Sequence, residues 1–334
     1  MNSVKTGKIY GINGPVIYLK GRSEFKMSEM VYVGSQKLVG EVIGLDKDLT
    51  TIQVYEETSG LRPGEEVVGT DAAVSVTLAP GILDNIFDGI ERPLEKIAEE
   101  GGAFVVRGVN VDSLDTEKLW ETHITVQEGE LVHGGTVIAE VQETRAIVHK
   151  CMVPPDLEGT VVSVKPDGQY TIQDVIVTVE LMDGTRKDLT MTQRWPIRVP
   201  RPVHHRYPAS VPLVTGQRIL DTMFPIAKGG TAAIPGGFGT GKTMTQHQIA
   251  KWSDADIIIY IGCGERGNEM TQVLEEFSEL VDPKSGNPLM DRTTLIANTS
   301  NMPVAAREAS IYTGLTLAEY YRDMGYDVAL GGSS

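Results

Sequence analysis

The sequence has 334 residues, a formal net charge of −15 and 41% hydrophobic residues. That length has room for two or three domains, and the composition is typical of soluble globular proteins. The acidic balance argues against a surface that holds nucleic acid through its phosphates. Two cysteines, Cys151 and Cys263, are too few for a disulfide framework or a zinc-ligand cluster, which fits a reducing compartment. No apolar run is long enough for a secretory signal or a membrane span, so we expect any membrane role to come through partner subunits.

The first half of the chain has the pattern of a β-rich protein. Residues 1–70 contain short strand-like runs about ten residues apart, separated by glycine and proline, and this spacing predicts a small N-terminal β-barrel. Residues 71–110 form a connector with a helix expected near residues 90–99. Residues 111–190 form a second β-rich domain. Neither β-rich region shows a catalytic constellation, so we expect structural roles for both.

Residues 191–334 form a different kind of domain. A proline-rich extended stretch at residues 195–205 precedes alternating strands and helices. Strands are predicted at residues 231–234, 256–261, 294–297 and 326–330. Helices are predicted at residues 241–252, from a cap at Asn268 to about residue 281, and at residues 305–324, with Gly325 ending the last one. This order predicts a parallel sheet covered by helices.

A phosphate-binding loop follows the first of these strands. The motif G-x4-G-K-[ST] is matched by Gly236, Gly237, Phe238, Gly239, Thr240, Gly241, Lys242 and Thr243. Glycines let successive backbone amides turn toward a phosphate, and the helix that begins there adds its positive end. Lys242 places a charge on the terminal phosphates, and the Thr243 hydroxyl can coordinate Mg²⁺. A dinucleotide fold fits poorly, because the glycines do not follow G-x-G-x-x-G and that fold does not require the Lys-Thr pair.

A second candidate loop follows the next predicted strand and reads GCGERGNE over residues 262–269. Ligands of open parallel sheets bind beyond the carboxyl ends of the strands, so we expect this loop to face the phosphate loop. The Glu265 carboxylate would position an attacking water, and Arg266 would stabilise charge on the transferred phosphoryl group. The alternative for this pair is an ordinary surface ion pair. Cys263 is expected to be a small buried filler, because no histidine lies nearby in the sequence to activate it.

With these motifs, the chain resembles the catalytic A subunits of archaeal-type and V-type rotary ATPases. The resemblance runs over nearly the whole chain. Its most specific parts are residues 212–226 (PLVTGQRILDTMFPI), the phosphate loop, residues 262–270 (GCGERGNEM) and residues 298–310 (NTSNMPVAAREAS). Residues 111–190 resemble the bulge domain that distinguishes these catalytic chains from their F-type counterpart.

The resemblance implies a multidomain fold with a RecA-like P-loop domain that binds ATP or ADP with Mg²⁺. Lys242 and Thr243 take the phosphate and magnesium roles, Glu265 orients water, and Arg266 supports the phosphate. It also implies an alternating hexameric ring with B subunits, which supply an arginine finger, and contacts with central and peripheral stalks. The implied activity couples ATP hydrolysis or synthesis to proton or sodium transport, on the cytoplasmic side and peripheral to the membrane.

The last strand departs from the family pattern. In the family it continues to an aspartate that holds magnesium through water, whereas here Leu330 is followed by Gly331, Gly332, Ser333 and Ser334. We interpret these four residues as a linker or scar, and expect a truncated chain without that aspartate. One alternative is therefore a module that binds nucleotide but turns it over poorly. A ring-shaped nucleic-acid motor is another alternative, disfavoured by the acidic balance and the lack of an aromatic-basic stripe.

Overall fold

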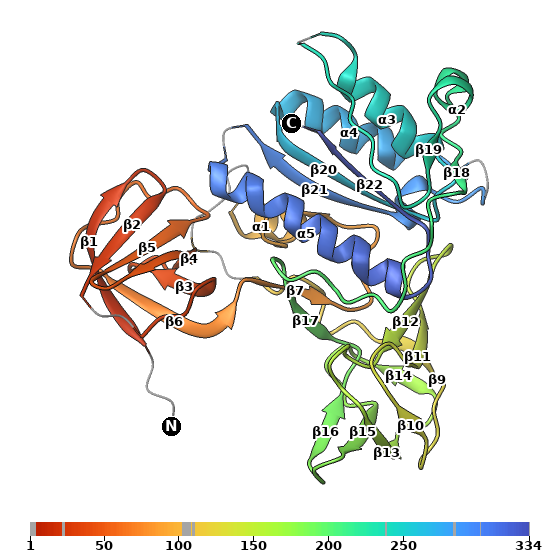
Figure 1. The fold of residues 1–334 in the computed structure, drawn as a ribbon, viewed down its shortest axis with the longest axis horizontal. Helices are drawn as coiled ribbons and strands as arrows, with labels where there is room; N and C mark the ends of the chain where they lie inside the picture. The colour runs from red at the N-terminus through yellow and green to blue at the C-terminus, as the bar shows by residue number, and fades with distance from the viewer. Residues whose placement is uncertain are drawn as a thin grey trace.

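The computed structural model describes residues 5–21, 24–101, 108, 111–237, 239–282, 285–300 and 302–333. Phe238, Ser334 and most of the connector between residues 102 and 110 lie outside the described residues. Figure 1 shows a barrel at one side, a layered α/β region above, and a second β-rich region below. The expected multidomain arrangement of barrel, β-rich region and α/β P-loop region is confirmed.

The N-terminal region is a closed antiparallel barrel in the strand order β1-β2-β5-β4-β3-β6. Its strands alternate buried and exposed residues, as half-buried strands do, and the buried set fills the interior with Ile17, Val31, Val42 and Ile52. The strand bounds are Thr6–Asn13 (β1), Val16–Lys20 (β2), Glu29–Val33 (β3), Leu38–Asp46 (β4), Leu49–Val54 (β5) and Glu66–Ala73 (β6).

The second β-rich region consists of antiparallel sheets in the orders β10-β13-β15-β16 and β12-β11-β9-β14, joined to the rest by the pair β17-β7. The connector supplies β7 (Ser75–Leu78), β8 (Ile86–Phe87) and α1 (Leu94–Gly101). The other bounds are Trp120–Ile124 (β9), Leu131–Val132 (β10), Val137–Gln142 (β11), Val148–Met152 (β12), Gly159–Val164 (β13), Gly168–Tyr170 (β14), Val177–Leu181 (β15), Arg186–Leu189 (β16) and Gln193–Pro196 (β17).

The α/β region is built on a parallel sheet in the order β22-β20-β21-β8. Its elements are Pro212–Leu213 (β18), Arg218–Met223 (α2), Ile226–Ala227 (β19), Lys242–Trp252 (α3), Ile257–Glu265 (β20), Gly267–Glu279 (α4), the 3-10 turn Leu289–Arg292 (η1), Thr293–Thr299 (β21), Val304–Asp323 (α5) and Val328–Ser333 (β22).

The two faces of this sheet are covered by different helices, as Figure 1 shows. Ile257, Ile259 and Ile261 of β20 belong to the core cluster that contains α5, whereas Ile258 and Tyr260 belong to the cluster that contains α3 and α4. This alternation follows from the two-residue period of a strand buried on both faces. It explains why β20 is a continuous apolar run in the sequence.

Three local predictions differ from the structure, and one strand was not predicted. Residues 231–234 form no strand, because a cavity separates them from the free edge of β22, whereas a ladder requires strands about 4.8 Å apart. Gly331–Ser333, interpreted above as a linker, continue β22 instead, because their backbone pairs with β20. The α4 helix begins at Gly267 with Arg266 as its N-cap, so Asn268 lies inside the first turn. The parallel strand β8 was missed, since two residues are too short for a periodic signal.

Candidate phosphate site

The phosphate loop turns through residues that require glycine. Gly239 and Gly241 have φ of +77° and +83°, in the left-handed region that other residues rarely adopt. The Thr240 hydroxyl donates to the carbonyl of Gly237 at 2.8 Å and closes the loop. A Cβ on Gly236 would lie 2.3 Å from that same hydroxyl oxygen. The loop therefore packs tightly against itself, which leaves no room for a side chain at Gly236. The predicted loop residue Phe238 lies outside the described residues.

The α3 helix begins at Lys242 with its N-terminus open toward the loop. Its N-cap, Gly241, provides no side-chain hydrogen bond, so the first backbone amides of the helix are available to an anion. Lys242 and Thr243 are half-buried in the first turn. Within the described part of the chain, neither side chain forms a hydrogen bond or ion pair. Amide donors, an ammonium group and a hydroxyl thus gather at one helix end.

The second loop begins at a β-bulge at the end of β20. The pairing of β20 with β21 shifts register between Cys263 and Glu265, and Gly264 between them has φ of +83°. The bulge re-aims the strand end, as bulges near binding sites often do. The Glu265 backbone carbonyl accepts a hydrogen bond from the Ser300 amide at 2.8 Å, and Glu265 as a whole is 6% exposed. The backbone of Glu265 is thereby held at the carboxyl edge of the sheet.

The two loops line a common cavity of 430 Å³. From the phosphate loop and α3 it is lined by Gly237, Gly239, Thr240, Gly241, Lys242, Thr243 and Met244, and from the second loop by Gly264, Glu265, Arg266 and Glu269. This volume is within the usual range of small-molecule sites. The structure therefore brings together every predicted site residue that it describes except Gly236, which supports the loop from behind. The amide, ammonium and hydroxyl donors suit a magnesium-bound polyphosphate, and the carboxylate suits a water facing it.

Arg307 is a candidate that the sequence alone did not single out. It lies in the first turn of α5, and its side chain packs against Gly264, with Cδ 3.0 Å and Nη1 3.3 Å from the position a Cβ would take there. Its Nε is buried and has no hydrogen-bond partner among the described residues. The Cys263 thiol, half-buried, donates to the Arg307 carbonyl at 3.3 Å. The arginine in the motif AAREAS was the available signal, but no spacing rule connects it to the phosphate loop.

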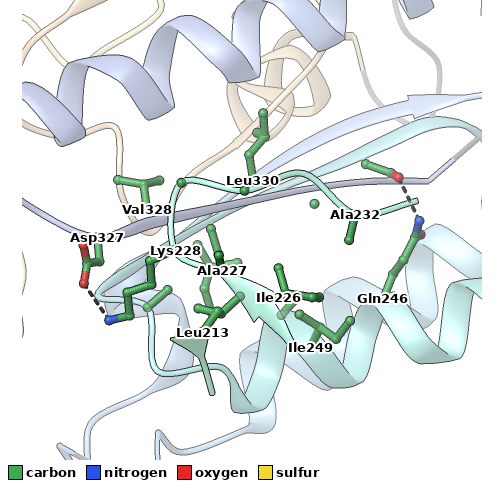
Figure 2. A pocket seen from close by; sticks show the side chains of 18 of the residues that line it. Leu213, Ile226, Ala227, Lys228, Ala232, Gln246, Ile249, Asp327, Val328 and Leu330 are labelled. Atoms are coloured by element: carbon green, nitrogen blue, oxygen red, sulfur yellow. Dashed lines mark hydrogen bonds and ion pairs between the residues drawn. The ribbon is translucent and has the colours of Figure 1, made fainter. Parts of the chain in front are cut away.

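A second cavity, of 250 Å³, lies on the other side of α3, between β22 and residues 226–234. Figure 2 shows its mainly apolar lining and two polar contacts. Lys228 forms an ion pair with Asp327 at 2.7 Å, and the Gln246 amide donates to the Gly332 carbonyl at 2.9 Å. Lys228, which lines this cavity, is already paired with Asp254 and Asp327, and the lining does not include the phosphate loop, so the cavity does not suit a triphosphate. The 430 Å³ cavity is therefore the candidate phosphate site.

Polar contacts join α3 to the sheet and to α4. His247 of α3 is buried and its Nε2 lies 2.9 Å from the Tyr260 hydroxyl of β20. Burial, reinforced by the neighbouring Lys251, lowers the pKa of His247 below its ordinary value, which keeps the ring neutral. Lys251 also pairs with Glu276, so α3 and α4 are tied together near the C-terminal end of α3.

Three family models match the chain in succession. Residues 9–71 match the beta-barrel domain of the ATP synthase alpha/beta family, residues 111–198 its barrel-sandwich domain, and residues 216–332 its nucleotide-binding domain. The V-type ATP synthase alpha chain 2 of Clostridium tetani is 62% identical over 97% of this chain. The A subunit of the A-type ATP synthase of Methanopyrus kandleri is 58% identical over 98% of it. The chain belongs to the ATP synthase alpha/beta family.

Within the ATP synthase alpha/beta family, the chain is similar to chains of V-type and A-type ATP synthases, and it spans 55% of the length of each of these relatives. A solved structure of the assembled ATPase EscN, from the type III secretion system of enteropathogenic E. coli, aligns with a TM-score of 0.60. That alignment covers 98% of this chain and 56% of EscN at 20% identity, which shows a shared fold. Among the described residues, no helix is long and apolar enough to cross a membrane.

Proposed function

We propose that this chain carries the catalytic nucleotide site of a rotary ATPase, which couples ATP hydrolysis or synthesis to proton or sodium movement. The observation that carries the proposal is the shared 430 Å³ cavity, where the phosphate loop faces the carboxylate of Glu265. The relatives of this chain are named as ATP synthase chains, and those names suggest the reaction that we propose. We propose four parts, at residues 1–70, 71–110, 111–190 and 191–334. The first three would serve as scaffold, and the last would carry the site.

The proposed roles follow from the position of each group. The α3 amides and Lys242 would hold the phosphates, and Thr243 would supply an oxygen ligand to Mg²⁺, whose charge would add to that of the lysine. Glu265, across the cavity, would orient the attacking water toward the terminal phosphorus. Arg266 and Arg307 would stabilise negative charge that develops on the equatorial oxygens.

The proposed partners complete a site that is open at one side. Phosphoryl transfer needs cationic groups around the terminal phosphate, and an arginine from a neighbouring B subunit would add one in trans. We propose a ring in which copies of this chain alternate with B subunits around a central stalk, with peripheral stalks outside it. The ring would lie on the cytoplasmic face, with contact to the membrane only through the ion-translocating sector.

The test is a lysine comparison in the complete protein, assembled in its ring. Lys242→Ala removes the ammonium group from the phosphate cavity, whereas Lys228→Ala removes one from the apolar cavity. A charge-assisted hydrogen bond is worth about 1.5–3 kcal/mol, so Lys242→Ala should weaken MgATP binding roughly 10- to 100-fold and lower turnover by at least a similar factor. Lys228→Ala should retain both. Full turnover by the Lys242→Ala ring would reject the proposed role.

A further inference from the structure

Far from the phosphate site, a buried polar cluster joins the second β-rich region to α5. It consists of Glu143, which follows β11, His149 of β12, and Tyr320 and Tyr321 near the end of α5. The side chains of Glu143 and His149 are 0% exposed, and both tyrosines are fully buried. A charged group placed this deep is costly unless all its lone pairs are used. Its hydrogen bonds therefore indicate what the cluster holds in place.

The Glu143 carboxylate binds two separate parts of the α/β region. One oxygen accepts hydrogen bonds from the backbone amides of Gly81, Ile82 and Leu83, at 2.8, 2.9 and 3.1 Å. The Tyr321 hydroxyl donates to the carboxylate at 2.9 Å and 3.0 Å. The carboxylate thus fixes the connector between β7 and β8, and it fixes α5 near its end.

His149 completes the cluster. Its Nδ1 lies 2.7 Å from the carboxylate, and its Nε2 lies 2.9 Å from the Tyr320 hydroxyl. Nδ1 thus donates to the Glu143 carboxylate, and Nε2 is paired with the Tyr320 hydroxyl, so both ring nitrogens are used. Burial acts to raise the pKa of Glu143, but His149 and the backbone amides outweigh it and leave the pKa below its ordinary value. The carboxylate is therefore ionised and acts only as an acceptor.

Both parts held by Glu143 lead to Arg307. Along α5, Tyr321 is 14 residues from Arg307, which is roughly 20 Å on a straight helix. Along the connector, the chain passes through β8, which pairs with β21, to Gly89. A Cβ on Gly89 would lie 2.2 Å from the carbonyl oxygen of Ala306, the residue before Arg307. The connector and α5 therefore meet again at the residue that packs against Gly264.

The helix between these points has little freedom to adjust. A Cβ on Gly314 would lie 2.5 Å from the Ile261 side chain, so α5 packs closely against β20. The Thr313 hydroxyl donates to the Gly89 carbonyl at 2.9 Å in the same turn. Since packed interiors transmit displacement rather than absorb it, a shift at Tyr321 would move the helix as one body.

We propose that Glu143 is a positioning residue for the phosphate site, and that it acts through α5 and the connector to hold Arg307 beside Gly264. This inference rests on the proposed function, because it assigns Arg307 to the terminal phosphate. It gives the β11–β12 hairpin a role beyond scaffold. A residue that only stabilised the fold would affect ATP and ADP binding alike, whereas a residue that positions Arg307 affects the nucleotide that carries the terminal phosphate.

The test measures the dissociation constants of MgATP and MgADP for the complete protein and compares their ratio. Glu143→Gln replaces an acceptor oxygen by a donor, and Tyr321→Phe removes only the hydroxyl, so the second variant serves if the first fails to fold. Each variant should weaken the binding of MgATP more than the binding of MgADP. For Glu143→Gln, the ratio of the MgATP to the MgADP dissociation constant should rise on the order of tenfold. Val179→Ala is the matched control, because Val179 is buried in β15 within the same β-rich region, away from α5.

The decisive comparison repeats the two substitutions in an Arg307→Ala background. If Glu143 acts through Arg307, the ratio should not shift further in that background. An unchanged ratio in both single variants, an equal shift in Val179→Ala, or a full additional shift without Arg307 would each overturn the proposal. If the unsubstituted protein binds neither nucleotide, the proposed function fails first and this inference falls with it.

Discussion

The Gly264→Ala substitution tests whether the end of β20 is built as the structure indicates. Gly264 has φ of +83°, and an alanine in that left-handed conformation costs roughly 1–2 kcal/mol. Its new Cβ would also lie 3.0 Å from Cδ and 3.3 Å from Nη1 of Arg307. An arginine side chain can move by a few tenths of an ångström, so we expect displacement of Arg307 rather than a large further loss of stability.

Two measurements follow from this reasoning. The midpoint of thermal unfolding should fall by a few degrees, since each kcal/mol corresponds to about 2–4 °C in a domain of 150–250 residues. MgATP affinity should fall more than MgADP affinity, because Arg307 moves away from the terminal phosphate.

Gly267→Ala is the matched control, three residues further along the same loop. It lies in α4, its φ is not positive, and nothing lies within 4 Å of its would-be Cβ. Alanine there should be neutral or stabilising by up to about 1 kcal/mol. Equal unfolding midpoints for the two variants, or a Gly264→Ala protein as stable as the unsubstituted one, would refute this description of the bulge.

Two other predictions concern stability. Gly314→Ala would place a Cβ 2.5 Å from the Ile261 side chain. The resulting overpacking costs about 1–3 kcal/mol, which should exceed the gain in helix propensity and lower the midpoint of thermal unfolding. An unchanged or higher midpoint would contradict the close approach of α5 to β20. Burial raises the pKa of Glu91 to about 8 from its ordinary value of 4.5. A carboxyl group whose pKa is higher in the folded than in the unfolded state stabilises the folded state while it is protonated. The free energy of unfolding should therefore decrease as pH rises from about 4.5 to 8, and Glu91→Gln should flatten that decrease in denaturation curves. An identical pH dependence in both proteins would contradict this prediction.

The sequence predicted the loops of the candidate phosphate site better than the strands around them. The motif from Gly236 to Thr243 specifies loop, helix start and donors together, so its position depends on local geometry alone. The second loop could also be placed, because carboxyl ends of parallel strands share one edge and the apolar run of β20 was unmistakable. The structure brings Glu265 and Lys242 to one cavity as that rule predicts.

The missed features depend on contacts between distant segments. Whether residues 231–234 or 331–333 join the sheet is decided by pairing with β20 and β22, not by their own composition. Gly331 and Gly332 have low strand propensity, yet the free backbone groups of β20 draw them into the ladder. Arg307 becomes a candidate site residue only because the start of α5 packs against Gly264 at the end of β20, and Glu143 meets Tyr321 across 178 residues of sequence.

The proposed phosphate site is tested most simply by an experimental structure of the complete protein with Mg²⁺ and a non-hydrolysable ATP analogue. We expect the β- and γ-phosphates within hydrogen-bond distance of the Gly239–Thr243 backbone amides and of the Lys242 ammonium group, with Glu265 facing the terminal phosphate. Triphosphate density in the apolar cavity beside β22, or elsewhere with the loop amides turned away, would contradict the assignment.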